Sequence, residues 1–173
     1  MDQRIQRLIA ELFLPIAGVF FWQWNTAFLL WFVLLDGITG LVVGRIHPVR
    51  RSPWEHTLLQ CGECVLAALL IFALSDSFTD SFFKFFFYED TGIPQGYFLL
   101  PMIVLGEWIK WKTSKKIGVY CFQPLKAIYA KIAFFGLLFV LGAVGIQDFY
   151  LSLTLIFLTA LVILFVPQDV LVI

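Results

Sequence analysis

Six long apolar stretches in succession constrain this chain more than any other feature. They cover residues 5–22, 27–44, 57–75, 93–111, 128–146 and 148–166. A helix that crosses the hydrocarbon core of a bilayer needs about 20 mostly apolar residues. The runs are continuous rather than alternating, and a backbone in lipid must satisfy its polar groups internally. We therefore expect about six transmembrane helices.

The composition excludes the main alternatives to a membrane protein. The chain has 173 residues, of which 61% are hydrophobic and 14% are charged. Soluble domains are roughly 45–50% apolar and about 25% charged, and a chain of this size cannot bury so many apolar side chains. This excludes a soluble globular domain, a disordered chain and a basic nucleic-acid binder. The predicted fold class is all-α, a polytopic integral membrane helical bundle forming one membrane domain over residues 1–173.

The connections and the basic residues predict the topology. Residues 23–26 alone separate the first two stretches, and Gln147 alone separates the last two, so both pairs are predicted to be tight helical hairpins. With both termini in the cytoplasm, eleven of the twelve lysines and arginines lie on the cytoplasmic side, as the positive-inside rule requires. Lys84 is the exception. The prediction is a multi-pass protein of the inner (cytoplasmic) membrane. The basic cytoplasmic loops are predicted to hold Arg45, Arg50, Arg51, Lys110, Lys112, Lys115 and Lys116.

The external segment 76–92 has acidic ends and a Phe-rich middle. Two interpretations stay open. The segment is either an interfacial helix lying in the headgroup region or a hairpin extension packed on the bundle.

Four carboxylates fall within the first four predicted spans, and they are Glu11, Asp36, Glu63 and Glu107. Acids at membrane depth are costly and face a bundle interior or a polar cavity. Arg7 lies one turn from Glu11 and Lys110 three residues from Glu107, whereas Asp36 and Glu63 have no such local base. The functional interpretation is a polar cluster that binds an ion or governs opening. The structural interpretation is a set of buried acids that fix helix packing.

The stretch 34–45 contains a helix-packing pattern. Gly37, Gly40 and Gly44 lie close to one helical face, and their spacing permits close contact between backbones. Thr39 is placed to hydrogen-bond across that contact. The pattern predicts a helix–helix seam, either within one chain or between chains.

No motif for catalysis or cofactor binding is found. Cys61-x-x-Cys64 with His56 supplies three candidate zinc ligands where a structural site needs four, and two of them lie inside a span. The cysteines are therefore interpreted as small apolar packing residues. We expect no enzyme activity, no catalytic residue, no metal and no cofactor, and we identify no nucleic-acid partner and no small-molecule substrate.

The order of these features over residues 25–126 resembles the phage-type holin family, which includes holins of phage lysis and toxin secretion. Asp36, Thr39 and Gly40 match an Asp-x-x-Thr-Gly motif that closes a span. The basic loop with Ser52 matches the segment that follows, and Glu107 with the lysines after it matches a later element. The run at 60–64 departs from the family, which has a basic residue early in that span.

The resemblance implies a non-enzymatic inner-membrane protein that self-associates and lets an endolysin or other cargo pass. Gly37, Gly40 and Gly44 would provide the oligomer seam, and Asp36, Glu63 and Glu107 would line the polar surface exposed on opening. The alternative is a structural or anchoring subunit of a larger membrane complex. A weaker alternative is a small transporter or proton-coupled channel that uses the carboxylates. In each case the lipid bilayer is a partner, and the chain is a homo-oligomer or part of a membrane complex.

Overall fold

The computed structural model describes residues 3–46, 54–75, 77–87, 95–117, 119–122, 125–166 and 169–172. Seven helices lie within these ranges, and the predicted helical architecture is confirmed. Each of the six predicted stretches overlaps one long helix. The helices are α1 (Gln3–Phe21), α2 (Thr26–Ile46), α3 (Trp54–Leu74), α4 (Phe78–Phe86), α5 (Gln95–Ile117), α6 (Leu125–Ala143) and α7 (Asp148–Phe165).

Three of the long helices have the length and hydropathy of a membrane span. They are α3 over Thr57–Leu74, α6 over Lys126–Ala143 and α7 over Asp148–Phe165. Within the described residues, α1, α2 and α5 carry shorter apolar stretches, Glu11–Phe21, Thr26–Val42 and Tyr97–Ile109. The structure thus has a helix at each of the six predicted places, and three of these helices are long and apolar enough to cross a bilayer.

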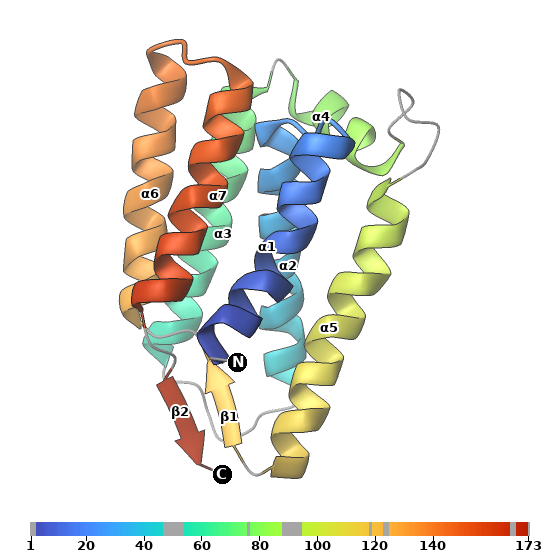
Figure 1. Cartoon of the computed structure of the whole chain (residues 1–173), viewed down its shortest axis with the longest axis vertical. Helices are drawn as coiled ribbons and strands as arrows, with labels where there is room; N and C mark the ends of the chain where they lie inside the picture. The colour runs from blue at the N-terminus through green and yellow to red at the C-terminus, as the bar shows by residue number, and fades with distance from the viewer. Residues whose placement is uncertain are drawn as a thin grey trace.

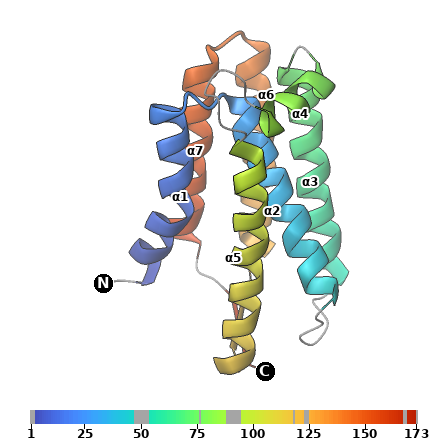
Figure 2. The same cartoon turned by 90° about the vertical axis from the view of Figure 1, so that its right-hand side faces the viewer.

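The long helices run alternately up and down. Figure 1 shows both chain termini at the lower end of the bundle, with α4 and the α6–α7 turn at the upper end. Helices α2, α3, α6 and α7 form a closed ring, because each packs against the next and α7 packs against α2. Helix α1 packs on the outside of α7 and α5 on the outside of α2, and Figure 2 shows these two as separate flanking helices. The result is a four-helix bundle with two outer helices.

Apolar side chains fill the ring and also cover its outside. Leu30, Ile71 and Leu138 in the interior are fully buried. Large apolar side chains on the outer surface are strongly exposed, among them Phe72 at 71% and Phe165 at 76%. A soluble domain rarely exposes apolar surface on this scale, whereas a bundle in lipid requires it.

Two tight turns close the upper end. Before α2, Asn25 accepts a hydrogen bond from the Phe28 backbone N–H at 2.8 Å, the geometry of a helix N-cap. After α6, the N–H of Gly145 bonds to the Gly142 carbonyl and the N–H of Ile146 to the Leu141 carbonyl, with Gly145 at φ 84°. This Schellman motif ends α6 at Ala143, three residues before the predicted end of the fifth stretch.

A two-stranded ribbon lies at the lower end and was not predicted. Strands β1 (Val119–Phe122) and β2 (Asp169–Val172) pair antiparallel, with Val119 opposite Val172. They meet because α5 and α7 both finish at that end of the bundle (Figure 1). The chain segments that follow these two helices are far apart in sequence, so no local pattern indicates the pairing.

The Phe-rich segment forms a helix that packs on the bundle. Helix α4 covers part of the predicted segment 76–92, and residues 76 and 88–92 lie outside the described residues. Ser77 caps its first turn by accepting the Asp80 N–H, and Phe85 on its inner face is fully buried. It contacts α2, α3 and α5.

Candidate functional site

The four predicted carboxylates come from four helices and differ in exposure. Glu63 on α3 is buried, Glu107 on α5 is half-buried, and Glu11 on α1 and Asp36 on α2 are exposed on the outside of the bundle. Each lies well inside its helix rather than at an end. The sequence therefore placed acids inside the apolar stretches correctly, but only one of them points into the bundle interior.

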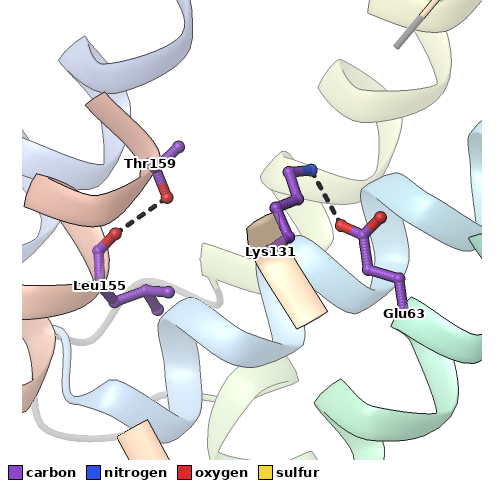
Figure 3. Close-up of polar contacts among 4 residues, drawn as sticks. All are labelled: Glu63, Lys131, Leu155 and Thr159. Carbon is purple, nitrogen blue, oxygen red and sulfur yellow. Dashed lines mark hydrogen bonds and ion pairs between the residues drawn. The ribbon is translucent and has the colours of Figure 1, made fainter. Parts of the chain in front are cut away.

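Glu63 is paired with a lysine on a different helix. The Nζ atom of Lys131 on α6 lies 2.8 Å from Oε1 of Glu63. Figure 3 shows the two side chains pointing toward one another between α3 and α6. A charge-assisted hydrogen bond of this length compensates part of the cost of burying the Glu63 carboxylate, while the Lys131 side chain is half-buried. Sequence reasoning assigned Glu63 no local base, and the lone lysine inside the apolar run of α6 was the signal that a partner was needed.

Two of the predicted seam glycines lie against α3 of the same chain. A Cβ atom added at Gly37 would stand 2.9 Å from the Cys64 sulfur, and one added at Gly40 would stand 3.3 Å from Nε2 of Gln60. These contacts mark a close approach of α2 and α3, of the kind that small residues permit in membrane bundles. Thr39 is half-buried on α2, and Gly44 falls in α2 outside the residues whose surroundings the structure describes.

The seam brings most of the predicted polar residues together. The Gly40 Cβ position is 3.8 Å from Oε2 of Glu107, so α5 meets α2 at the same level as Gln60 of α3. Asp36, Glu63 and Lys131 all lie within electrostatic reach of the Cys64 thiol. Glu11 lies on the flanking helix α1, which packs mainly on α7. Gln60, Glu63, Glu107 and Lys131 thus lie around the α2–α3 seam, and Asp36 lies on the exposed side of the same stretch of α2. We call these five residues the mid-bundle cluster.

A second polar group, at the upper end, was not anticipated from the sequence. The backbone N–H of Thr26 donates to both carboxylate oxygens of Asp148 at 3.2 Å. The Thr26 hydroxyl donates to the Asp148 carbonyl and shares a 3.0 Å hydrogen bond with the Ser152 hydroxyl, and Thr26 and Ser152 are fully buried. Asp148 therefore caps the start of α2 from the start of α7. We call these three residues the upper hydroxyl network.

Hydroxyls elsewhere on α7 bond to their own helix. Thr154 donates to the Tyr150 carbonyl, and Thr159 donates to the Leu155 carbonyl at 2.8 Å, as Figure 3 shows for the latter. Back-bonding of this type lets a threonine sit in an apolar helix without an external partner. The donor hydrogen of each of these hydroxyls is therefore used within α7.

Of the predicted basic residues, Lys112 is the one whose side chain is described. It is exposed, and its Nζ lies 4.7 Å from the centroid of the Trp108 ring one turn earlier on α5. Arg45 is the penultimate residue of α2, and Lys110, Lys115 and Lys116 lie in the lower part of α5. Their side chains lie outside the described set. Arg50 and Arg51 lie outside the described residues.

The cysteines of α3 are free thiols in the structure. Cys61 is exposed and Cys64 is half-buried against Gly37. Among the residues that the structure describes, no three His, Cys, Asp or Glu side chains are grouped so that they could hold a metal ion.

No family model matches the chain, and neither a curated protein nor a solved structure is similar to it.

Proposed function

We propose that this chain is an integral membrane protein with six spans that associates with copies of itself and opens a passage for an endolysin or other cargo, in the manner of a holin. The fold supports the membrane placement through three span-length helices and an apolar outer surface. The proposal has no enzymatic step.

The two ends of the bundle support an orientation with both termini in the cytoplasm. The termini share the lower end, where α2 finishes at Arg45 and Ile46 and α5 finishes in its lysine-rich segment (Figure 1). Lys84 lies on α4 at the opposite end. Basic residues concentrate at the cytoplasmic ends of membrane helices, so the lower end faces the cytoplasm in this proposal.

The exposure of Asp36 is the observation that carries the proposal. Its side chain lies on the outside of the bundle, ten residues from the start of α2, while apolar side chains fill the ring interior. Acids within membrane segments usually lie against another helix or a hydrated cavity rather than in lipid. An outer face that presents an exposed carboxylate among apolar side chains is therefore suited to contact with a neighbouring copy or with a hydrated passage. Glu11 is also exposed on the outside of the bundle.

In this proposal the seam glycines pack helices within one chain. Helix α3 of the same chain packs against Gly37 and Gly40, so these two glycines set the distance between α2 and α3. In the proposal the surface between copies is the outer face that carries Asp36.

Induced expression in a bacterial host tests the proposal, with collapse of the membrane potential and uptake of an impermeant dye as readouts. We expect both after wild-type induction and a marked loss with Asp36→Asn at equal membrane abundance. Asp80→Asn, an exposed aspartate on α4, is the matched control and is expected to permeabilise normally. Unchanged growth and potential after wild-type induction would contradict the proposal.

The second candidate is a structural subunit of a larger membrane complex. This candidate is favoured because Gly37 and Gly40 already pack against α3 of the same chain. The small-residue face of α2 is therefore not available for packing against another copy. Crosslinking in native membranes separates the two functions. A ladder of crosslinked homo-oligomers would support the holin-like passage function, whereas one copy crosslinked to unrelated chains would support the structural-subunit function.

A further inference from the structure

Helix α4 is fixed to the bundle on one side. The indole N–H of Trp31 on α2 donates to the Ser81 hydroxyl at 3.0 Å. The Trp31 ring also packs on Phe78 and Phe82, with centroid distances of 5.0 and 5.2 Å. With Phe85 fully buried beside them, these contacts fix which face of α4 points to the bundle.

The apolar arc of α4 extends beyond the face that the bundle covers. At about 100° per residue, Phe82, Phe86, Thr79 and Phe83 follow one another around the helix from the buried face, and Asp80, Lys84 and Ser81 complete the circle. Phe87 follows as the C-cap residue. Phe83 is 54% exposed and Phe87 is 48% exposed. The uncovered surface is therefore divided into a phenylalanine flank and a charged flank with Asp80 and Lys84.

The phenylalanine flank is continuous with the apolar outside of the long helices. The Phe87 ring lies 5.3 Å from Tyr97 at the start of α5, and Tyr97 and Phe98 are both exposed. On the other side, Phe78 lines a shallow groove with Val65, Leu69 and Phe72 of α3, all exposed and apolar. The apolar surface of the spans thus runs up onto α4 from two helices.

From this arrangement we propose that α4 is a membrane-interface anchor that lies in the leaflet opposite the termini, with Phe83 and Phe87 inserted among the acyl chains. Asp80 and Lys84 face water at the level of the lipid phosphates. A helix with a wide apolar arc and a charged flank lies in the plane of the interface in this way. The occupant of the flank is phospholipid. The inference rests on the membrane placement proposed above and is independent of the passage function.

Spin-label accessibility in vesicles of phosphatidylcholine and phosphatidylglycerol tests the anchor. The full chain carries Cys61→Ala, Cys64→Ala and Cys121→Ser, and single cysteines are then introduced as Phe83→Cys, Lys84→Cys or Leu69→Cys. Oxygen concentrates in hydrocarbon and a nickel chelate stays in water. We expect oxygen to dominate collisions at positions 83 and 69 and the nickel chelate to dominate at position 84.

The control at Leu69 separates failure of the anchor from failure of the membrane placement. Nickel access at position 69 would overturn both. If position 69 is in lipid while 83 and 84 both collide with nickel, α4 lies in water and the anchor is wrong. If position 83 is shielded from both reagents, a protein surface covers the flank, and the phospholipid assignment is overturned.

Discussion

The upper end and the middle of the bundle hold polar groups in different ways. At the upper end, Thr26, Asp148 and Ser152 join α2 to α7 through hydroxyls, a carboxylate and backbone groups. In the middle, α3 is joined to α6 by two formal charges, Glu63 and Lys131. The upper end of the bundle lies near the predicted bilayer surface, and the middle of the bundle lies in the predicted hydrocarbon core. The comparison indicates that polar contacts at both levels are made across helices that are far apart in sequence.

The two regions differ in what the loss of one partner leaves behind. Removing a neutral hydroxyl leaves an unsatisfied donor or acceptor, which costs about 1–3 kcal/mol. Removing one member of a fully buried ion pair leaves an uncompensated charge, which costs about 3–5 kcal/mol. In this pair Glu63 is buried and Lys131 is half-buried, so the lower end of that range applies. The following substitutions test that difference.

The largest loss is expected for Lys131→Met. The substitution leaves the buried Glu63 carboxylate without the cation 2.8 Å away, so we expect a loss of about 3 kcal/mol in the free energy of unfolding. Thermal unfolding in detergent micelles, followed by circular dichroism, measures it. The double variant Glu63→Gln/Lys131→Met is expected to be more stable than the single variant. Equal stability of the two would show that the ion pair is not the relevant interaction.

Gly37→Ala tests the seam beside the ion pair. The added methyl group stands 2.9 Å from the Cys64 sulfur, and overpacking of this kind costs about 1–3 kcal/mol. Gly62→Ala on α3 is the matched control, since nothing lies within 4 Å of its added Cβ. The control is expected to be neutral or up to about 1 kcal/mol more stable, because alanine favours a helix over glycine. A loss at both positions would show that the effect is not specific to the seam.

Thr26→Val tests the upper hydroxyl network. Valine keeps the shape of threonine but leaves the buried Ser152 hydroxyl and the Asp148 carbonyl without the Thr26 hydroxyl, so we expect a loss of about 1–2 kcal/mol. Thr26→Val/Ser152→Ala is expected to recover part of the loss, as measured by the same unfolding experiment. A loss as large as that of Lys131→Met would abolish the contrast between the two regions.

Trp31→Phe is expected to have the smallest effect. It removes the hydrogen bond to Ser81 and keeps an aromatic ring against Phe78 and Phe82, which costs about 1 kcal/mol. The change is local, so amide hydrogen exchange is expected to accelerate across α4 and stay constant in α7. Faster exchange in both helices would show that Trp31 contributes to the global stability of the bundle rather than to the attachment of α4 alone.

Local patterns in the sequence were sufficient to predict the helices. Continuous apolar runs about as long as a bilayer is thick predict the six long helices. Asn25 and Gly145 are residue types that are typical of the turns before α2 and after α6. The acids inside the runs were also recognised from the sequence, because a charged residue in an apolar stretch stands out wherever the helix later packs.

Pairing was decided by the tertiary structure. The base that meets Glu63 is 68 residues away, the carboxylate that caps α2 is 122 residues from Thr26, and β1 joins a strand at the other end of the chain. The same holds for Asp36, whose position outside the bundle depends on which face of α2 meets α3. Composition and periodicity are properties of one segment at a time, so they determine which segments of this chain form apolar helices. Which faces touch depends on how all the helices pack at once, and that determines which charges are buried, paired or left on the surface.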